Sequence, residues 1–410
     1  MAKIGTSLGG LTQFRAKRDA FLREALLALN TPEKDRVVLE TITAREGGGE
    51  YLRLNDKWRN EPQGRHSLRA AWDECAKHAQ VSGVEGSASD IFLKLLSTDI
   101  TLKLYSQPEN LEPRGMRICK LEDVPLLETD NERAILGQFP LLTKLAAGVE
   151  PPTGVIPEAQ LKIQTYAQMG AVSIKPKDII NDRLDVFAGA PDKLRRAAVI
   201  SAELAIANAL YAPGTCSEDT RAFYSALYHG NVGTSQLTLN NLGMTAAIAG
   251  RNAMVQQKGV KDSLNTGAGW PLMHEPKFMV VPTALRSIAN AICNRDQVPN
   301  SVTGYPMANE FADYNVEPLE LPLLDPLNVN HWYLMADPND SPALSFSILD
   351  GIALPVIFAG WNTGGKVFDT QPLIRGNMPI YPVVLECRWF FNVNNYDYRG
   401  VYAQEYTPAT

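Results

Sequence analysis

The sequence predicts a mixed α+β protein with several distinct regions. Three features indicate this class: an alanine-rich helical stretch over residues 191–211, a strand-rich stretch from about residue 316 onward, and a segment over residues 134–172 that glycine and proline interrupt repeatedly. Alanine has the highest helix propensity, and short apolar, β-branched runs are typical of buried strands. Helices and strands are therefore expected in different parts of the chain.

The composition is that of a folded, slightly acidic protein. The chain has 410 residues, is 45% hydrophobic and carries a net charge of -6. A protein that grips DNA usually shows a basic patch or stripe, and none is evident, so any nucleic acid beside this chain is expected to be enclosed rather than bound by sequence. No apolar run is long enough to predict a membrane span, and the first ten residues lack the pattern of a secretory signal.

The first region, residues 1–86, is expected to be an arm or an appended helical segment. Residues 11–30 form an amphipathic pattern, and a second short helix is expected over residues 67–80. Nothing in this region suggests a core of its own. The apolar face of the first helix is made of Phe14, Phe21, Leu22, Ala25, Leu26 and Leu29.

The middle of the chain alternates between helices and a broken segment. Residues 87–104 are expected to be a helix that leads into a strand. A β-hairpin that projects from the body would explain the interruptions over residues 134–172. Pro191 suits the first turn of the alanine-rich helix, and a further helix is expected over residues 240–257.

The remaining chain is expected to be rich in strands. Asp350-Gly351 predicts a hairpin-type turn, and residues 381–391 are apolar enough to be central in a sheet. A helix is expected between the strand at residues 277–281 and Cys293. The expected strands are residues 277–281, 316–321, 332–335, 344–349, 356–359 and 382–392.

Motifs for catalysis, cofactors or metals are missing from the sequence. The five histidines form no metal-binding spacing, and neither a dinucleotide nor a phosphate-binding glycine motif occurs. A GxSxG string at residues 5–9 has no room for the strand that a nucleophile elbow needs. We therefore predict no catalytic, cofactor or metal site. The cysteines are widely spaced and odd in number, which predicts buried thiols in a reducing cytoplasm: Cys75, Cys119, Cys216, Cys293 and Cys387.

Two short clusters nevertheless have alternative interpretations. In an enzyme, Asn231 could orient His229 as a base, with Cys216 or Ser225 as the nucleophile. Alternatively, residues 229–231 form a turn in which Gly230 takes a positive φ.

The second cluster is Asp397-Tyr398-Arg399-Gly400. Asp397 and Arg399 are expected to pair with different neighbours, and Gly400 to allow a tight bend. The cluster is either a simple strand end or an intersubunit contact, for which a bidentate arginine is well suited.

Several strings, in this order, resemble the Mu-like major head subunit family. They are IKPKDIINDRLDVF at residues 174–187, PDKLRRAA at 191–198, HGN at 229–231, QQKG at 256–259, and DYRGVY at 397–402. The resemblance covers about residues 87–402. Arg183 departs from the family pattern, which commonly has a second acid after Asn181-Asp182, so the local ion pairing is expected to differ. The region up to about residue 80 is not matched.

The resemblance implies a Hong Kong 97-type capsid fold. It divides the chain into an N-terminal arm and a peripheral domain that starts at residue 87, and an extended loop follows. The spine helix and the axial domain come next, and the chain ends in a return strand of the peripheral domain. The N-terminal arm is residues 1–86, the start of the peripheral domain 87–133 and the extended loop 134–172. The part with the spine helix is 173–235, the mainly axial part 236–378, and the return strand with the C-terminus 379–410.

The implied function is that of a major capsid protein of a tailed phage. Its hexamers and pentamers would form an icosahedral shell around double-stranded DNA, in a virion assembled in the host cytoplasm. A scaffold or prohead protease, a portal and decoration proteins are the implied partners. Candidates for assembly contacts are Asn181, Asp182, Arg183, Asp397, Tyr398 and Arg399.

Some relatives of this fold cross-link lysine to asparagine between subunits, and Lys144 and Lys162 lie in the expected loop. Two other functions remain open at this point. One is an encapsulin-like compartment with a protein cargo, and the other is a cytoplasmic enzyme that uses His229 as base.

Overall fold

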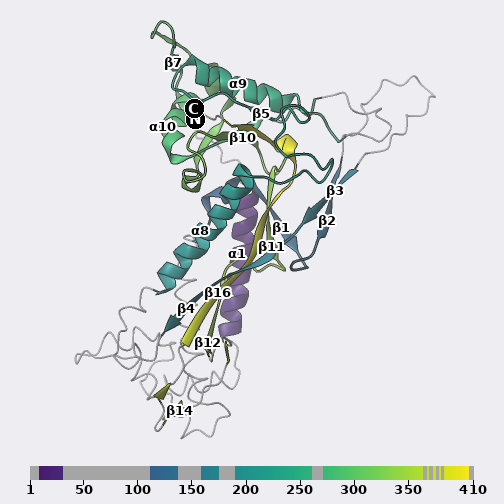
Figure 1. The fold of residues 1–410 in the computed structure, drawn as a ribbon, viewed down its shortest axis with the longest axis vertical. Coiled ribbons are helices and arrows are strands. Elements are labelled where there is room, and N and C mark those ends of the chain that lie inside the picture. Colours follow the sequence, from purple (N-terminus) through teal and green to yellow (C-terminus); the bar gives the residue numbers. More distant parts are fainter. Residues whose placement is uncertain are drawn as a thin grey trace, which may run out of the picture.

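A computed structural model of the chain describes residues 9–30, 111–136, 158–174, 190–260, 271–362 and 383–405, with three short strands between residues 367 and 379. The molecule is elongated, with two bodies that each contain a β-sheet (Figure 1). The predicted α+β class is confirmed. The helices expected over residues 67–80 and 87–104 lie outside the described residues, as do residues 137–157.

The lower body is built on a six-stranded sheet around β16. This strand pairs antiparallel with β4, β11 and β12, and β1 adds to β11 in parallel. The prediction that β16 is central is confirmed, because it pairs with three strands. The strands are β1 (Cys119–Val124), β11 (Leu344–Leu349), β16 (Val383–Asn395), β12 (Val356–Asn362), β13 (Val367–Phe368) and β4 (Tyr166–Ile174).

Two long helices, α1 (Gly9–Asn30) and α8 (Ala190–Tyr211), lie along this sheet (Figure 1). Both helices were predicted and both are confirmed. The first region is nevertheless more than an appended segment, because α1 contributes to the core of the lower body. Phe14 is fully buried and meets Phe346 edge-on, with 6.4 Å between ring centroids. Arg18 is also buried, and it forms an ion pair with Glu112.

The upper body is built on a five-stranded sheet covered by α9 (Asn241–Val255) and α10 (Arg286–Asn294). The side chain of Asn240 caps α9 by accepting hydrogen bonds from the first backbone amides. In order across the sheet, the strands are β5 (Val232–Gly233), β17 (Val401–Gln404), β10 (Trp332–Ala336), β6 (Pro276–Val281) and β9 (Glu317–Glu320).

A two-stranded ladder, β2 (Asn131–Leu136) with β3 (Glu158–Ile163), extends from the side of the molecule. Val124, Leu161 and Ile163 form a small core at its base. The expected loop range continues to residue 172, but β4 pairs with β16 along its whole length. The part of that range from Tyr166 onward therefore belongs to the large sheet, because its backbone bonds are made there.

The remaining elements are short. Hairpin β7–β8 projects from the upper body, and β14–β15 is a separate pair (Figure 1). Their bounds are β7 (Gln297–Pro299), β8 (Pro306–Ala308), β14 (Leu373–Ile374) and β15 (Met378–Pro379). The 3-10 turns are η2 (Arg114–Ile118), η3 (Thr283–Leu285), η4 (Glu310–Tyr314), η5 (Pro322–Leu324) and η6 (Tyr398–Gly400).

The turn predicted at Asp350-Gly351 is present, but it does not join the two strands of a hairpin. Both residues have positive φ, 41° and 77°, and Ile352 N donates to Leu349 O at 2.8 Å. The strands on either side, β11 and β12, do not pair with each other, because β16 lies between them.

The expected domain ranges also cut across the two sheets. β11 and β12 fall in the expected axial range, yet they lie in the lower sheet with β16. β17 falls in the range of the expected return strand, yet it lies in the upper sheet. The chain thus crosses between the bodies more than once.

Candidate functional site

A buried polar cluster lies between the loop after α8, the end of α9 and η6. The structure confirms the turn at residues 229–231, with Gly230 at a φ of 62°. The amides of His229 and Gly230 both donate to Ser225 O, at 3.1 and 2.7 Å. This tight turn aims the His229 ring into the body, where the residue is only 6% exposed.

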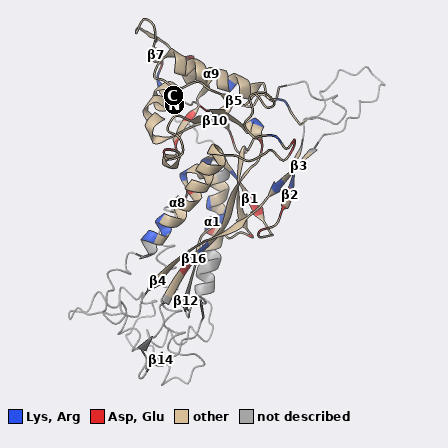
Figure 2. Cartoon of the chain, in the orientation of Figure 1, with Lys and Arg blue, Asp and Glu red and all other residues tan. Residues whose placement is uncertain are grey.

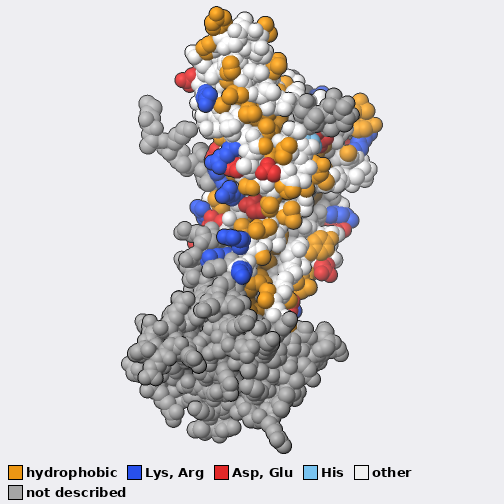
Figure 3. Space-filling model, turned by 60° about the vertical axis from the view of Figure 1, so that its left-hand side comes forward, with side chains coloured by type: hydrophobic (Ala, Val, Ile, Leu, Met, Phe, Trp, Pro, Cys, Tyr) orange, Lys and Arg blue, Asp and Glu red, His pale blue; other side chains and the backbone are white. Residues whose placement is uncertain are grey.

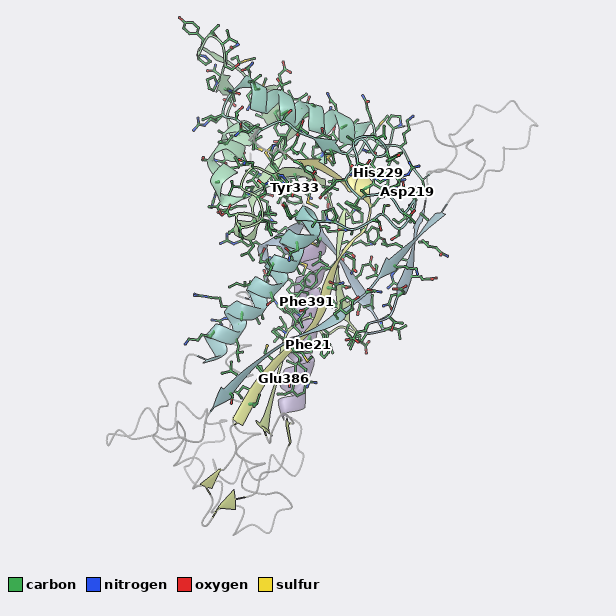
Figure 4. All side chains as sticks on the ribbon, in the orientation of Figure 1. Phe21, Asp219, His229, Tyr333, Glu386 and Phe391 are labelled. Carbon is green, nitrogen blue, oxygen red and sulfur yellow. The ribbon has the colours of Figure 1, made fainter. Side chains whose placement is uncertain are left out.

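Both ring nitrogens of His229 are engaged. Nδ1 lies 3.1 Å from Phe223 O, and Nε2 lies 3.0 Å from a carboxylate oxygen of Asp219. Figure 4 shows His229 and Asp219 together at the side of the upper body. A carbonyl and a carboxylate oxygen accept hydrogen bonds, so the ring donates to one or the other through whichever nitrogen carries the proton.

Tyr398 of η6 stacks on this ring, with 3.8 Å between centroids and 14° between planes. Partial burial works to raise the pKa of Asp219, but the hydrogen bonds from His229 and from Arg221 N hold it below its usual value. The environment therefore favours a charged Asp219 facing the imidazole.

Asn231 does not orient His229 as the enzyme interpretation requires. It is fully buried; its Oδ1 accepts from Ser225 N at 3.0 Å, and its Nδ2 donates to Phe223 O at 3.0 Å. Burial also raises the pKa of the Cys216 thiol, which disfavours the thiolate that a nucleophile needs. The trio is thus a structural turn, held by backbone carbonyls and amides.

Arg399 anchors the other half of the cluster. It is 2% exposed, and its guanidinium binds Glu218 through contacts of 2.8 and 2.9 Å. It also contacts Asp397 Oδ1 at 3.1 Å and donates from Nε to Lys258 O at 2.7 Å. Burial alone would lower its pKa, but these partners raise it instead, so the charge is fully retained.

Arg399 pairs with a different neighbour, Glu218, as expected, but it also contacts Asp397, whose Oδ1 accepts from Arg399 N as well. Gly400 ends the 3-10 turn η6 and is also needed for space. A Cβ there would lie 2.3 Å from Ser341 O.

The cluster borders an open cavity of about 960 Å³. Ala159 and Gln160 of β3, Asp219, His229 and Tyr398 are among its lining residues. Gln257 Nε2 donates to His229 O at 2.8 Å, so the end of α9 is tied to the same turn. The arrangement ties the loop after α8, the end of α9 and η6 to one another beside β3.

The predicted assembly residues fall into three groups. The structure brings Asp397, Tyr398 and Arg399 together with His229. Lys162 lies apart on β3, where its Nζ pairs with Asp130 at 2.9 Å. Lys144, Asn181, Asp182 and Arg183 lie outside the described residues.

Glu218 and Asp219 were not predicted from the sequence. Glu218 lies 181 residues from its partner Arg399, whereas Asp219 is only ten residues from His229, and no local motif marks either acid. Within the described part of the chain, no group of three His, Cys, Asp or Glu residues is arranged to hold a metal ion. No helix in that part is long and apolar enough to cross a membrane.

A family model described as "Phage capsid protein" matches residues 158–403. This range contains the whole cluster, both sheets apart from β1, and the β3 strand of the ladder. The model does not single out the Mu-like subfamily, which stays a prediction. None of the curated proteins matches the chain.

Solved structures similar to this chain include several from phages and a virus-like particle. A structure of Microbacterium phage Oxtober96 is 10% identical, with a TM-score of 0.43 over 72% of this chain and 91% of that chain. The capsid of the cyanophage P-SCSP1u is 11% identical, with a TM-score of 0.43 over 70% and 87%. The virus-like particle from Pyrococcus furiosus is 9% identical, with a TM-score of 0.37 over 74% and 98%. Likenesses this distant carry no argument of their own.

Proposed function

The chain belongs to the phage capsid protein family, and from this premise we propose that its hexamers and pentamers close into an icosahedral shell around double-stranded DNA. It is a major capsid protein, and its place is the virion. Closed point-group symmetry lets one subunit surface be reused many times, so many modest contacts add up to a stable shell. The family match over residues 158–403 is the observation that carries this proposal.

The described elements support a division into the domains of a Hong Kong 97-type subunit. The peripheral domain corresponds to the lower body with α8 as the spine helix, and the axial domain to the upper body with α9 and α10. The extended loop corresponds to the β2–β3 ladder and reaches the adjacent subunit. The N-terminal arm includes α1, whose packing in the core favours retention of this helix in the mature shell.

The shell encloses DNA without reading its sequence. Figure 2 shows basic and acidic residues interspersed along the described ribbon. The net charge of -6 also argues against an affinity based on many phosphate contacts. The protein acts by assembly in the host cytoplasm rather than by catalysis, with a scaffold or prohead protease, a portal and decoration proteins as partners.

The contents of purified particles test this proposal against a compartment with a protein cargo. Particles that contain the chain are treated with nuclease, disrupted and assayed for nucleic acid and for protein. Protected double-stranded DNA of uniform length is the expected result. Particles that hold a stoichiometric second protein and no protected DNA would contradict the proposal.

A further inference from the structure

The β2–β3 ladder joins the large sheet at Gln164 and Thr165, the two residues between β3 and β4. The chain leaves the large sheet here, because the last backbone pair of β4 with β16 is Tyr166↔Phe391. Thr165 is fully buried, and its carbonyl oxygen accepts a hydrogen bond from Glu128 N at 2.9 Å. The loop before β2 is thereby fastened to the same point, so both strands of the ladder start from one place.

Three polar side chains of the large sheet converge on the backbone of Gln164. Ser347 Oγ, Asn392 Nδ2 and Asn394 Nδ2 donate to its carbonyl oxygen at 3.0, 3.2 and 3.1 Å. Asn394 Oδ1 also accepts from Gln164 N at 3.3 Å, so this side-chain amide contacts the backbone much as a neighbouring strand would. Ser347 lies opposite Asn392 in the register of β11 with β16, and alternate residues of a strand share a face. The three side chains therefore lie on one face of the sheet, and together they are called the Gln164 clamp.

The side chain of Gln164 holds the other strand of the ladder. Its Nε2 donates to Asp130 Oδ1 at 2.6 Å, and Asp130 lies immediately before β2. Asp130 also pairs with Lys162 of β3 at 2.9 Å. One residue thus connects the large sheet to both strands of the ladder, through its backbone and through its side chain.

The other described contacts at the base of the ladder direct it less strongly. The small core there is apolar, and hydrophobic contact is non-directional. Arg133 adds contacts to β1, at 3.1 Å to Asp123 O and at 3.4 Å to Glu122. Toward the upper body, Ala159 and Gln160 of β3 border the open cavity of about 960 Å³, which leaves space beside the ladder. The direction of the ladder therefore depends on its hydrogen-bonded root.

We propose that the Gln164 clamp fixes the angle at which the ladder leaves the subunit, and that this angle sets the curvature of the shell. The inference rests on the proposed shell function, in which the ladder reaches the adjacent subunit. A contact repeated from copy to copy gives a closed assembly only when its rotation fits closure, and otherwise gives open forms. Ser347, Asn392 and Asn394 are therefore positioning residues for assembly, although none of them needs to touch a neighbouring subunit.

The variant Asn394→Leu tests the clamp. Leucine keeps the branched shape of asparagine but removes both contacts with the backbone of Gln164. Asn395→Leu is the matched control, because it also loses two backbone contacts, but at the end of α8. With its amide oriented to suit both partners, Asn395 donates to Ala209 O at 3.2 Å and accepts from Gly214 N at 3.1 Å. Denaturant unfolding of the unassembled subunits checks that both variants fold.

Both variants leave the apolar surface on the α8 side of the molecule intact. The ladder lies on the right in Figure 1, away from the side that Figure 3 brings forward. On that side, hydrophobic side chains run along the described body among charged ones. Neither variant changes a charge or removes one of these hydrophobic side chains, so a change in assembly reports on the ladder.

Two measurements give the expected result. In unassembled subunits, the amide hydrogen of Gln164 is expected to exchange at least about tenfold faster in Asn394→Leu than in the wild type, and at the wild-type rate in Asn395→Leu. Electron microscopy is expected to show particles of one uniform diameter for the wild type and for Asn395→Leu. Asn394→Leu is expected to lose this uniformity and to give several diameters, open shells or no closed shell.

Uniform Asn394→Leu particles of wild-type diameter would overturn the positioning role while the shell function stands, and so would an equal loss of uniformity in Asn395→Leu. If Asn394→Leu does not fold, Ser347→Ala, which removes one contact to Gln164 O, takes its place under the same criteria. If the wild type never assembles, the shell function fails and the positioning role fails with it. Unchanged exchange at Gln164 would contradict the clamp itself in either case.

Discussion

Arg399 and Glu218 form a bidentate ion pair, with contacts of 2.8 and 2.9 Å, although 181 residues separate them. The pair ties the loop after α8 to η6, the turn that joins the central strand of the lower sheet to β17 of the upper sheet. The guanidinium also holds Lys258 O, just beyond the end of α9. One buried side chain thus fixes how the two bodies meet beside the β2–β3 ladder.

Replacement of Arg399 by methionine is expected to destabilise the subunit strongly. Arg399→Met leaves Glu218 and Asp397 without their buried cation, which typically costs about 3–5 kcal/mol. Arg388→Met is the control, because the Arg388 side chain is 40% exposed against 3% for Arg399, and its pair with Glu386 is expected to contribute about 0–1 kcal/mol. Denaturant unfolding of the unassembled subunits measures both losses. Similar small losses would show that the buried pair does not hold the bodies together.

Phe14→Ala is expected to lower the free energy of unfolding by about 3–5 kcal/mol. The ring is fully buried against Phe346, so truncation leaves a cavity in the core of the lower body. Gln13→Ala, on the exposed side of α1, is the matched control and is expected to change little. The same denaturant titration applies. A negligible effect of Phe14→Ala would mean that α1 is detachable, as a segment removed at maturation would be.

The contact between Asp219 and His229 is expected to weaken in acid. The pKa of Asp219 is lowered in the folded protein from its usual 3.8, so the stabilisation is fully present above pH 3.8 and is lost as the pH falls through the lower folded value. Asp219→Asn removes this contribution. The difference in unfolding free energy between wild type and Asp219→Asn should shrink as the pH falls below 3.8. A difference that grows toward acid would contradict the assignment.

Lys162 is not expected to form a covalent cross-link. Its ion pair with Asp130 raises the pKa of Lys162, which keeps the amine protonated and therefore non-nucleophilic. Particles of Lys162→Arg and wild type should give the same bands on a denaturing gel. Lys144→Arg is the parallel variant for the other candidate. A ladder of covalent oligomers that disappears only in Lys162→Arg would contradict this prediction.

Local patterns were sufficient to predict the four helices α1, α8, α9 and α10 and several of the strands. The alanine content of α8 and the apolar runs of β6, β11 and β16 each mark an element within its own residues. The positive φ of Gly230 was predicted in the same way, because a turn's backbone depends on the few residues that form it.

Strand partners and the polar cluster depend on distant residues and could not be predicted in this way. β1 pairs with β11, more than 200 residues later in the chain, and nothing in the sequence of either strand identifies its partner. Asp350-Gly351 has the backbone of a hairpin turn, but β16 enters between its flanking strands. Glu218 and Asp219 look like ordinary surface acids until the fold places Arg399 and His229 beside them.

Electron microscopy of the purified chain after size-exclusion chromatography tests the central claim most directly. Uniform hollow shells, or rings of five and six subunits in the included peak, are the predicted result. A monomer or small dimer that never assembles, even with a scaffold or a crowding agent, would contradict the account of this protein as a shell-building subunit.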